Sequence, residues 1–272
     1  MTEKGMFKFS KIPKLKSPSL VVSWSKDAGK FGAKVIDFLN KKLGSEEFCQ
    51  IEPTGFFSLG GVKVEDDIAQ FPESKFYCCE RDELVIFKSD QPRYEWYKFL
   101  NSVLDAAEYY GKIKELYTVS GTISSIAHTS PRRILAVFNQ PELKKILQGY
   151  GLVDMEYEGE PALNSYLLWI AKRRNIPGVS LWAEIPFYLA AQEDPKAWRR
   201  MLEFFDRRFT LNIDLEEISE EIKKQNKKIT SIRRQKPAIN KYIGQLERGF
   251  MLNEKEQEKL AKEVYQFLKE RS

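Results

Sequence analysis

Four apolar runs alternate with helix-like segments, and this alternation restricts the fold more than any other feature of the sequence. The runs are SLVVSW at 19–24, ELYTVSG at 115–121, RILAVFN at 133–139 and GVSLWAEI at 178–185. The two middle runs are of the nearly continuous apolar kind that strands buried on both faces show. Strands that alternate with helices predict an α/β domain with a mainly parallel sheet and some antiparallel pairs.

Shorter strands and the connecting helices complete this expected domain. Residues 74–80 and 83–90 predict a hairpin around Arg81 and Asp82, and 47–52 and 55–59 predict two further strands. Helices are expected at 27–43, at 92–111 between Pro92 and Gly111, at 141–149 and at 160–173. Ligands of such sheets bind beyond the carboxyl ends of the strands.

After residue 194 the sequence predicts helices only. The segment 214–236 carries an apolar stripe at heptad-like spacing, formed by Leu215, Ile218, Ile222, Ile229 and Ile232, and Pro237 ends it. Two shorter helices follow. We therefore place the α/β domain at 1–212 and a helical appendage at 213–272. Two interpretations of the stripe remain open: packing on the same chain, or a coiled-coil contact with another subunit.

The strand-to-helix corner at 23–39 has the outline of a phosphate-binding loop but lacks its chemistry. A P-loop requires Gly-Lys-Ser/Thr, whereas Gly29 and Lys30 precede Phe31, so no hydroxyl is present to bind magnesium. Asp27 would also repel an anion at a helix N-terminus. We interpret the corner as structural, with Asp27 or Ser25 capping the helix; an anion contact is the alternative.

Composition excludes several classes of protein. No apolar run is long enough for a membrane helix, and the basic N-terminus has no apolar signal core. Three cysteines, two of them adjacent, give poor geometry for a disulfide or a metal, and suit buried thiols in a reducing cytoplasm. The net charge of +5 does not by itself predict nucleic-acid binding.

No arrangement of residues in the sequence identifies a catalytic site. His128 is the single histidine, and no Gly-x-Ser-x-Gly elbow accompanies it. Glu184 ends a strand, where a carboxylate acts as a base, as a ribose ligand or in a structural ion pair. The sequence assigns no catalytic residue, no metal site and no cofactor. If a ligand pocket exists, its candidate residues are Trp24, Asp27, Lys30, Ser120, His128 and Glu184.

Three stretches in order along the chain carry a family resemblance. The first holds Trp24, Asp27, Gly29 and Gly32. The second holds His128, Thr129 and Pro131. The third, at 158–189, carries Leu167-Leu168, Ile176-Pro177-Gly178, Ser180-Leu181, Glu184, Pro186 and Tyr188. Over roughly residues 19–250 the chain resembles the proteasome assembly chaperone 2 family, with Asn164 and Ser165 where that family often has glycine.

The resemblance implies a three-layer α/β fold related to nucleoside phosphorylases and hydrolases, and a cytoplasmic homo-oligomer. It implies a non-enzymatic, chaperone-like or scaffolding protein with a partner of the proteasome type. The alternative is a small-molecule-binding protein or enzyme of nucleoside-phosphorylase-like fold. The chain ends in LKERS and lacks the terminal hydrophobic-Tyr-x tail by which archaeal chaperones of this type bind the proteasome. Docking by that route is not expected.

Overall fold

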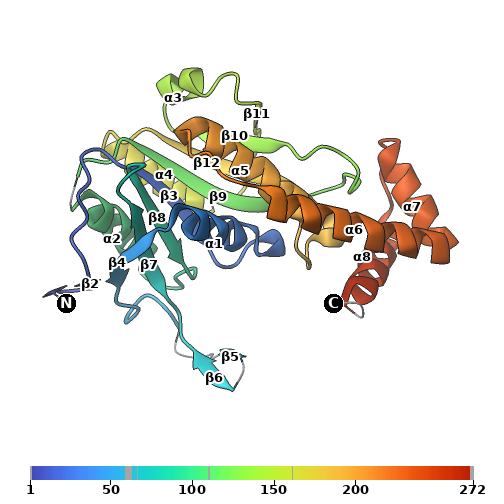
Figure 1. Ribbon diagram of the computed structural model, residues 1–272, viewed down its shortest axis with the longest axis horizontal. Helices are drawn as coiled ribbons and strands as arrows, with labels where there is room; N and C mark the ends of the chain where they lie inside the picture. Colours follow the sequence, from blue (N-terminus) through green and yellow to red (C-terminus); the bar gives the residue numbers. More distant parts are fainter. Residues whose placement is uncertain (1, 59–62, 66, 110, 161, 270–272) are drawn as a thin grey trace.

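A ten-stranded sheet forms the centre of the computed structural model, which describes residues 2–58, 63–65, 67–109, 111–160 and 162–269 (Figure 1). Its strands are β1 (Thr2–Lys4), β2 (Phe7–Phe9), β3 (Ser19–Trp24), β4 (Glu46–Ile51), β7 (Ser74–Cys79), β8 (Leu84–Ser89), β9 (Glu115–Ser124), β10 (Ile134–Phe138), β11 (Leu152–Asp154) and β12 (Gly178–Pro186). A separate ribbon of β5 (Lys63–Glu65) and β6 (Ile68–Gln70) projects from the body.

Helices connect and cover these strands. They are the short 3₁₀ helix η1 (Ala28–Lys30), α1 (Phe31–Leu43), α2 (Trp96–Glu108), α3 (Pro141–Ile146), α4 (Leu163–Arg173), the short 3₁₀ helix η2 (Phe187–Leu189), α5 (Pro195–Phe209), α6 (Glu216–Gln235), α7 (Pro237–Glu247) and α8 (Glu254–Lys269).

The centre of the sheet is parallel and its edges are mixed, as the sequence predicts. The spatial order is β1-β2-β4-β7-β8-β3-β9-β12-β10-β11. Strands β8, β3, β9 and β12 run parallel, whereas β10 runs antiparallel to β12 and the four strands beyond β8 pair in an antiparallel manner. The carboxyl ends of the four central strands therefore meet at one edge.

Two hydrophobic clusters lie on opposite faces of the sheet, because alternate residues of each strand point to opposite faces. One cluster joins the sheet to α1 and α5, and the other joins it to α2 and α4. Along β3, for example, Val21 belongs to the first cluster and Leu20 and Val22 to the second. The architecture is a mixed α/β fold with helices on both faces of one large sheet.

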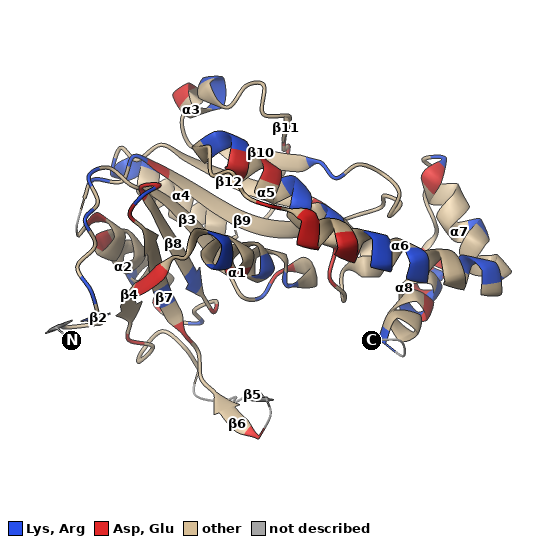
Figure 2. Cartoon of the chain, in the orientation of Figure 1, with Lys and Arg blue, Asp and Glu red and all other residues tan. Residues whose placement is uncertain are grey.

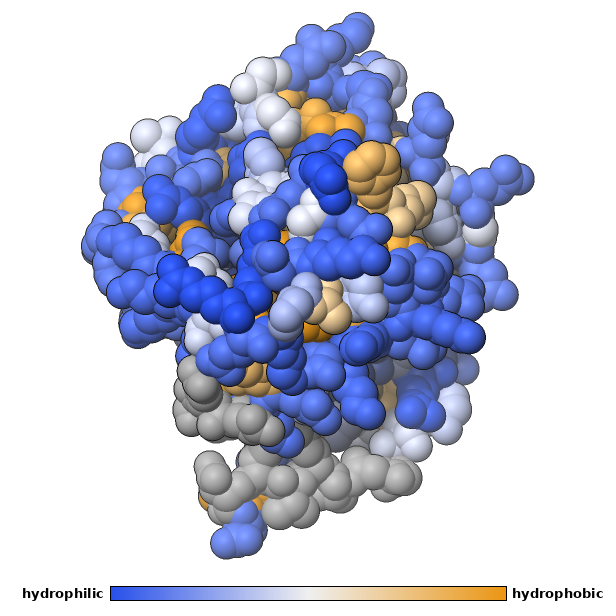
Figure 3. All heavy atoms as spheres, turned by 90° about the vertical axis from the view of Figure 1, so that its right-hand side faces the viewer, coloured by the Kyte–Doolittle hydropathy of each residue, from blue (hydrophilic) through white to orange (hydrophobic). Residues whose placement is uncertain are grey.

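The three C-terminal helices extend from one end of this body (Figure 1). Ile218, Ile229 and Ile232 of the α6 stripe are buried in the same cluster as α1 and α5. Of the two interpretations of the stripe, packing on the same chain is therefore the one that the structure supports. The first turn of α6 is acidic and its last turn is basic (Figure 2). The outer surface at this end is mainly hydrophilic (Figure 3).

Two local predictions were wrong. Residues 55–58 form a turn, not a strand, and residue 59 lies outside the described residues. Phe56 and Phe57 leave the sheet because each packs edge-on against Phe99, with ring centroids 5.0 and 5.7 Å apart. The helix expected from Pro92 begins at Trp96, whose indole N–H donates to the carbonyl of Pro92.

Candidate functional site

The corner between β3 and α1 is held by the carboxylate of Asp27. Its Oδ2 accepts the backbone N–H groups of Gly32, in the first turn of α1, and of Gly121 on β9, both at 2.9 Å. Asp27 thus caps the start of the helix, as the sequence predicts, and also ties the corner to a neighbouring strand. Ser25, the other capping candidate, donates instead to the carbonyl of Ser89.

Glycine at position 32 is required because α1 lies directly against the sheet. A Cβ there would come within 2.3 Å of the Ser23 hydroxyl and 2.8 Å of the Val119 carbonyl oxygen. The neighbouring Lys30 adopts left-handed backbone angles, with φ of 51°, which are uncommon for a residue with a side chain. The close approach of helix and strand explains Gly32, and a left-handed φ of 65° explains Gly29, so neither glycine requires a bound phosphate.

Asp27 carries a charge that its surroundings disfavour. Burial raises the pKa of this carboxyl to about 6, although its backbone hydrogen bonds pull the pKa downward. Its second oxygen, Oδ1, is buried and has no hydrogen-bond partner among the described residues. A carboxylate in such an environment either weakens the fold or has a role at a nearby site.

A cavity of about 640 Å³ lies beside this corner. Its walls come from both ends of the chain: the corner itself, residues 190–193, the start of α5, α6 and α8. Glu221 and Lys224 of α6 pair with each other across 2.7 Å, whereas Lys30 and Lys228 make no ion pair within the described parts of the chain. The lining residues are Asp27, Gly29, Lys30, Ala190, Ala191, Gln192, Glu193, Pro195, Trp198, Glu221, Lys224, Gln225, Lys228 and Leu268.

Trp24 and Ser120 lie on the other face of the sheet and meet through Asn164. The Trp24 indole N–H donates to Asn164 Oδ1 at 2.6 Å, and Asn164 Nδ2 donates to the Ser120 hydroxyl at 2.9 Å. All three side chains are buried. Asn164, which replaces a common glycine of the resembled family, therefore fastens α4 to β3 and β9, and the sequence does not reveal this contact.

His128 is buried in the loop between β9 and β10, against Tyr188 of η2. The Tyr188 hydroxyl lies 3.0 Å from the His128 ring Nδ1 and also accepts the His128 backbone N–H. Burial, and to a smaller extent the charge of Arg233, lower the pKa of His128 to about 4. The ring is therefore neutral at physiological pH, and the described contacts include no serine positioned as its nucleophile.

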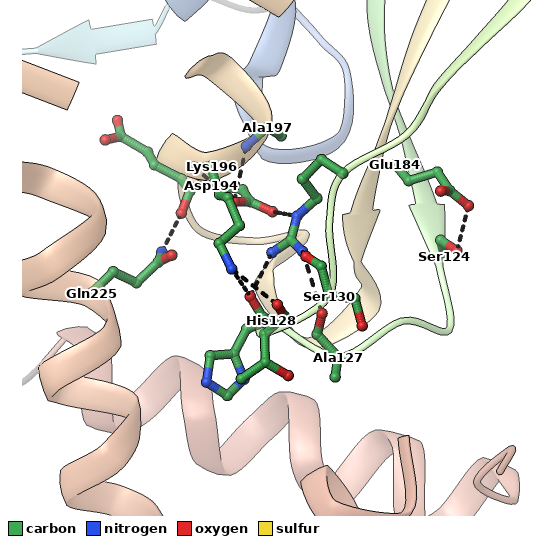
Figure 4. Close-up of polar contacts among 12 residues, drawn as sticks. Ser124, Ala127, His128, Ser130, Glu184, Asp194, Lys196, Ala197 and Gln225 are labelled. Carbon is green, nitrogen blue, oxygen red and sulfur yellow. Dashed lines mark hydrogen bonds and ion pairs between the residues drawn. The ribbon is translucent and has the colours of Figure 1, made fainter. Parts of the chain in front are cut away.

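Glu184 occupies the carboxyl end of β12 in a structural ion pair. Arg133 donates to both of its carboxylate oxygens, at 2.6 and 2.8 Å, and the Ser124 hydroxyl donates at 3.1 Å. Burial alone would raise the pKa of Glu184, but these partners hold it below its usual value. Figure 4 shows Glu184 and Ser124 directed toward one another, apart from the group around His128.

A buried ion pair that sequence reasoning missed ties the same loop to α5. Arg132 and Asp194 have side chains 1% and 0% exposed, and Arg132 Nε donates to Asp194 Oδ2 at 2.7 Å. The guanidinium also donates to carbonyls of the loop, and Asp194 caps α5 by accepting the N–H groups of Lys196 and Ala197 (Figure 4). Only a tendency of Asp to precede Pro at a helix start could have pointed to Asp194.

The six candidate pocket residues do not share one cavity. Asp27 and Lys30 line the cavity beside the corner, whereas Trp24, Ser120, His128 and Glu184 are engaged elsewhere. Within the described residues no group of three or more His, Cys, Asp and Glu side chains is arranged to hold a metal ion. The three cysteines are buried free thiols. In the described residues, no helix is long and apolar enough to cross a membrane.

Comparison with known proteins places this architecture among characterised folds. The sequence matches the PAC2 family over residues 22–233. No curated protein matches the chain. Pyrococcus furiosus PbaB, an archaeal proteasome activator, is 20% identical with a TM-score of 0.68, and the alignment covers 84% of this chain and 98% of PbaB.

Two proteins of Mycobacterium tuberculosis have similar structures. The proteasome-assembly chaperone homologue Rv2125 is 16% identical with a TM-score of 0.71, over 83% of this chain and 99% of that one. Rv2714, a protein of unknown function, is 19% identical with a TM-score of 0.77, over 92% and 90%. At these identities the likeness establishes a common fold.

Proposed function

The chain belongs to the PAC2 family, and on that premise we propose that it is a non-enzymatic, oligomeric protein with a chaperone-like or scaffolding role. One observation about the site carries the proposal: the polar residues expected to form a pocket are dispersed and mostly bonded to one another or to the backbone. Catalytic groups, in contrast, converge on a common reacting centre.

The proposed partner is a protein of the proteasome class. PbaB is described as a proteasome activator and Rv2125 as a proteasome-assembly chaperone homologue, and both share this fold. We place the protein in the cytoplasm, in keeping with three buried thiols that form no disulfide, and propose that it requires no cofactor.

Native mass spectrometry with purified proteasome α and β subunits of the same organism tests this role. We expect a complex of the chain with free or partly assembled subunits, and faster formation of the assembled particle when the chain is present. Absence of a complex at tens of micromolar, with unchanged assembly kinetics, would contradict the proposal. Bovine serum albumin at the same concentration controls for nonspecific protection of unassembled subunits.

The alternative role is that of a small-molecule-binding protein or enzyme with a nucleoside-phosphorylase-like fold. The cavity beside the corner favours it, because its volume of about 640 Å³ falls in the range of ligand pockets. Its lining includes Asp27 and the lysines Lys30 and Lys228.

Calorimetry with Mg-ATP, and separately with a nucleoside and inorganic phosphate, tests this alternative. We expect no measurable ATP affinity, because Lys30 has no adjacent hydroxyl for magnesium and Asp27 stands at the helix start. Micromolar binding that Lys30→Ala abolishes would contradict the structural interpretation of the corner. Loss of a charge-assisted contact of about 1.5–3 kcal/mol would weaken such binding by roughly ten- to a hundredfold.

A further inference from the structure

An exposed group of aromatic side chains covers the outer surface where α2 and α4 meet. We call it the aromatic face, and it consists of Tyr94 just before α2, Trp96 and Tyr97 in the first turn of α2, and Tyr166 and Trp169 on α4. Their exposed fractions lie between 39% and 58%. Isolated exposed aromatics need no explanation, but four on two adjacent helices, with a fifth just before α2, form a patch of the kind found at binding surfaces.

The side chains of the aromatic face are arranged against each other before any partner arrives. The rings of Trp96 and Tyr166 lie edge to face with centroids 6.0 Å apart, and those of Tyr97 and Trp169 lie 6.2 Å apart. The guanidinium of Arg173 lies 4.9 Å from the Trp169 ring. Each contact joins groups on the outer surface, so little side-chain freedom remains to be lost on binding.

The underlying helices hold this surface rigidly. The inner sides of α2 and α4 are buried in the cluster on their face of the sheet, with Phe99 and Leu167 fully covered. Arg174, directly after α4, donates to Asp105, Glu108 and Asn101 of α2. The outer rings are therefore not needed to fix the helix pair, which leaves them available to a partner.

We propose that the aromatic face binds the aromatic face of a second copy of this chain, across a two-fold axis that runs between and along α2 and α4. This assignment rests on the self-association included in the proposed function. Aromatic side chains each bury about 150–250 Å². At the observed exposures, the face offers roughly 500 Å² per copy, or about 1,000 Å² for two copies when all of it is covered, which is about the smallest area of a biological interface and corresponds to a weak dimer.

The charges around the aromatic face are complementary under this symmetry. Near its carboxyl end α2 carries Asp105, which pairs with Arg174 of the same chain and keeps 54% of its side chain exposed. The exposed Lys172 and Arg173 lie near the carboxyl end of α4. The proposed axis stacks α2 of one copy on α4 of the other in the same direction. The amino-terminal halves of α2 and α4, which carry the aromatic side chains, therefore meet those of the second copy. The carboxyl end of α2, with its acidic residues, meets the basic carboxyl end of α4 of the second copy.

Sedimentation velocity of the full chain from about 1 to 100 μM tests the proposal. Central aromatic residues dominate the energy of such interfaces, so we expect a dimer whose dissociation constant rises at least tenfold in Trp169→Glu and in Tyr97→Glu. Met251→Glu is the control, because Met251 is 77% exposed in the loop between α7 and α8, at the opposite end of the molecule. Circular dichroism establishes that each variant is folded.

Hydrogen exchange at low and high concentration gives a second measurement. We expect slower exchange at high concentration in peptides from α2 and α4, and no change in α7 and α8. A wild-type monomer at 100 μM would overturn both this assignment and the proposed self-association. A dimer that survives both aromatic substitutions, or that Met251→Glu disrupts, would overturn the aromatic face alone. Protection of α2 and α4 by proteasome subunits in a monomeric chain would assign the face to that partner and overturn a second copy.

Discussion

Replacement of Asp27 by asparagine should change how the stability of the protein depends on pH. In the folded protein the pKa of Asp27 is raised from 3.8 to about 6 by burial. A raised carboxyl pKa contributes stability that is fully present below the unfolded pKa and is lost as the pH rises through the folded pKa. At neutral pH the charge therefore destabilises the fold, by an amount that corresponds to about 3 kcal/mol.

The variant Asp27→Asn retains an oxygen that accepts the N–H groups of Gly32 and Gly121, but it carries no charge. Loss of the charge should stabilise the fold, but part of this gain in stability is offset. The amide nitrogen takes the place of Oδ1, which has no hydrogen-bond partner among the described residues, and burying that nitrogen unpaired costs about 1–3 kcal/mol. The net stability change at neutral pH is accordingly small. The pH dependence distinguishes the two proteins more clearly. Between about pH 7.5 and about pH 5, the free energy of unfolding of wild type should increase by roughly 1.4 kcal/mol relative to that of the variant.

Urea unfolding at these two pH values, followed by tryptophan fluorescence, measures this difference. Asp37→Asn removes a half-exposed carboxylate of α1, which pairs with Lys88, and controls for the general change in charge. Asp27→Ala leaves two backbone N–H groups without their acceptor and should be less stable than wild type at both pH values. If the difference between wild type and Asp27→Asn is the same at both pH values, the carboxyl does not have a raised pKa and our reasoning from burial is wrong.

Two further predictions concern the fold. Arg132→Met should lower the free energy of unfolding by about 3–5 kcal/mol in urea titrations, because it leaves the buried carboxylate of Asp194 unpaired. The control Arg199→Met removes an ion pair on the surface and should lower the free energy of unfolding by less than about 1 kcal/mol. Equal effects of the two substitutions would refute the burial assigned to the Arg132–Asp194 pair. Truncation after residue 212 should leave a folded but less stable α/β core by circular dichroism, since the sheet keeps its helices on both faces; complete unfolding would place α6–α8 within the core domain.

The sequence by itself determined the positions of the long central strands and the structural role of the corner between β3 and α1. Short apolar runs bounded by turn or loop residues are typical of strands buried within a sheet, so β3, β9, β10 and β12 were predicted close to their observed bounds. The missing hydroxyl after Lys30 was enough to predict a structural corner, and the sequence limited its cap to Asp27 or Ser25, of which Asp27 accepts the helix N–H group. These properties depend on residues close together in the chain, and local chemistry fixes them.

Only the tertiary structure decided how the candidate residues are distributed. Trp24, Ser120 and Glu184 follow the strand alternation to the face that α2 and α4 cover, whereas Asp27 and His128 lie on the side of α1 and α5. Residues at the same edge of a sheet are thus divided between two faces, which cannot share one pocket.

The buried polar contacts were likewise beyond prediction from sequence. Asn164 meets Trp24 across 140 positions of the chain, and Arg132 meets Asp194 across 62. Each contact forms because a buried polar group requires a partner, and the packing of helices on the sheet determines which group is within reach. Sequence can show that such residues are present, but the fold alone selects their partners.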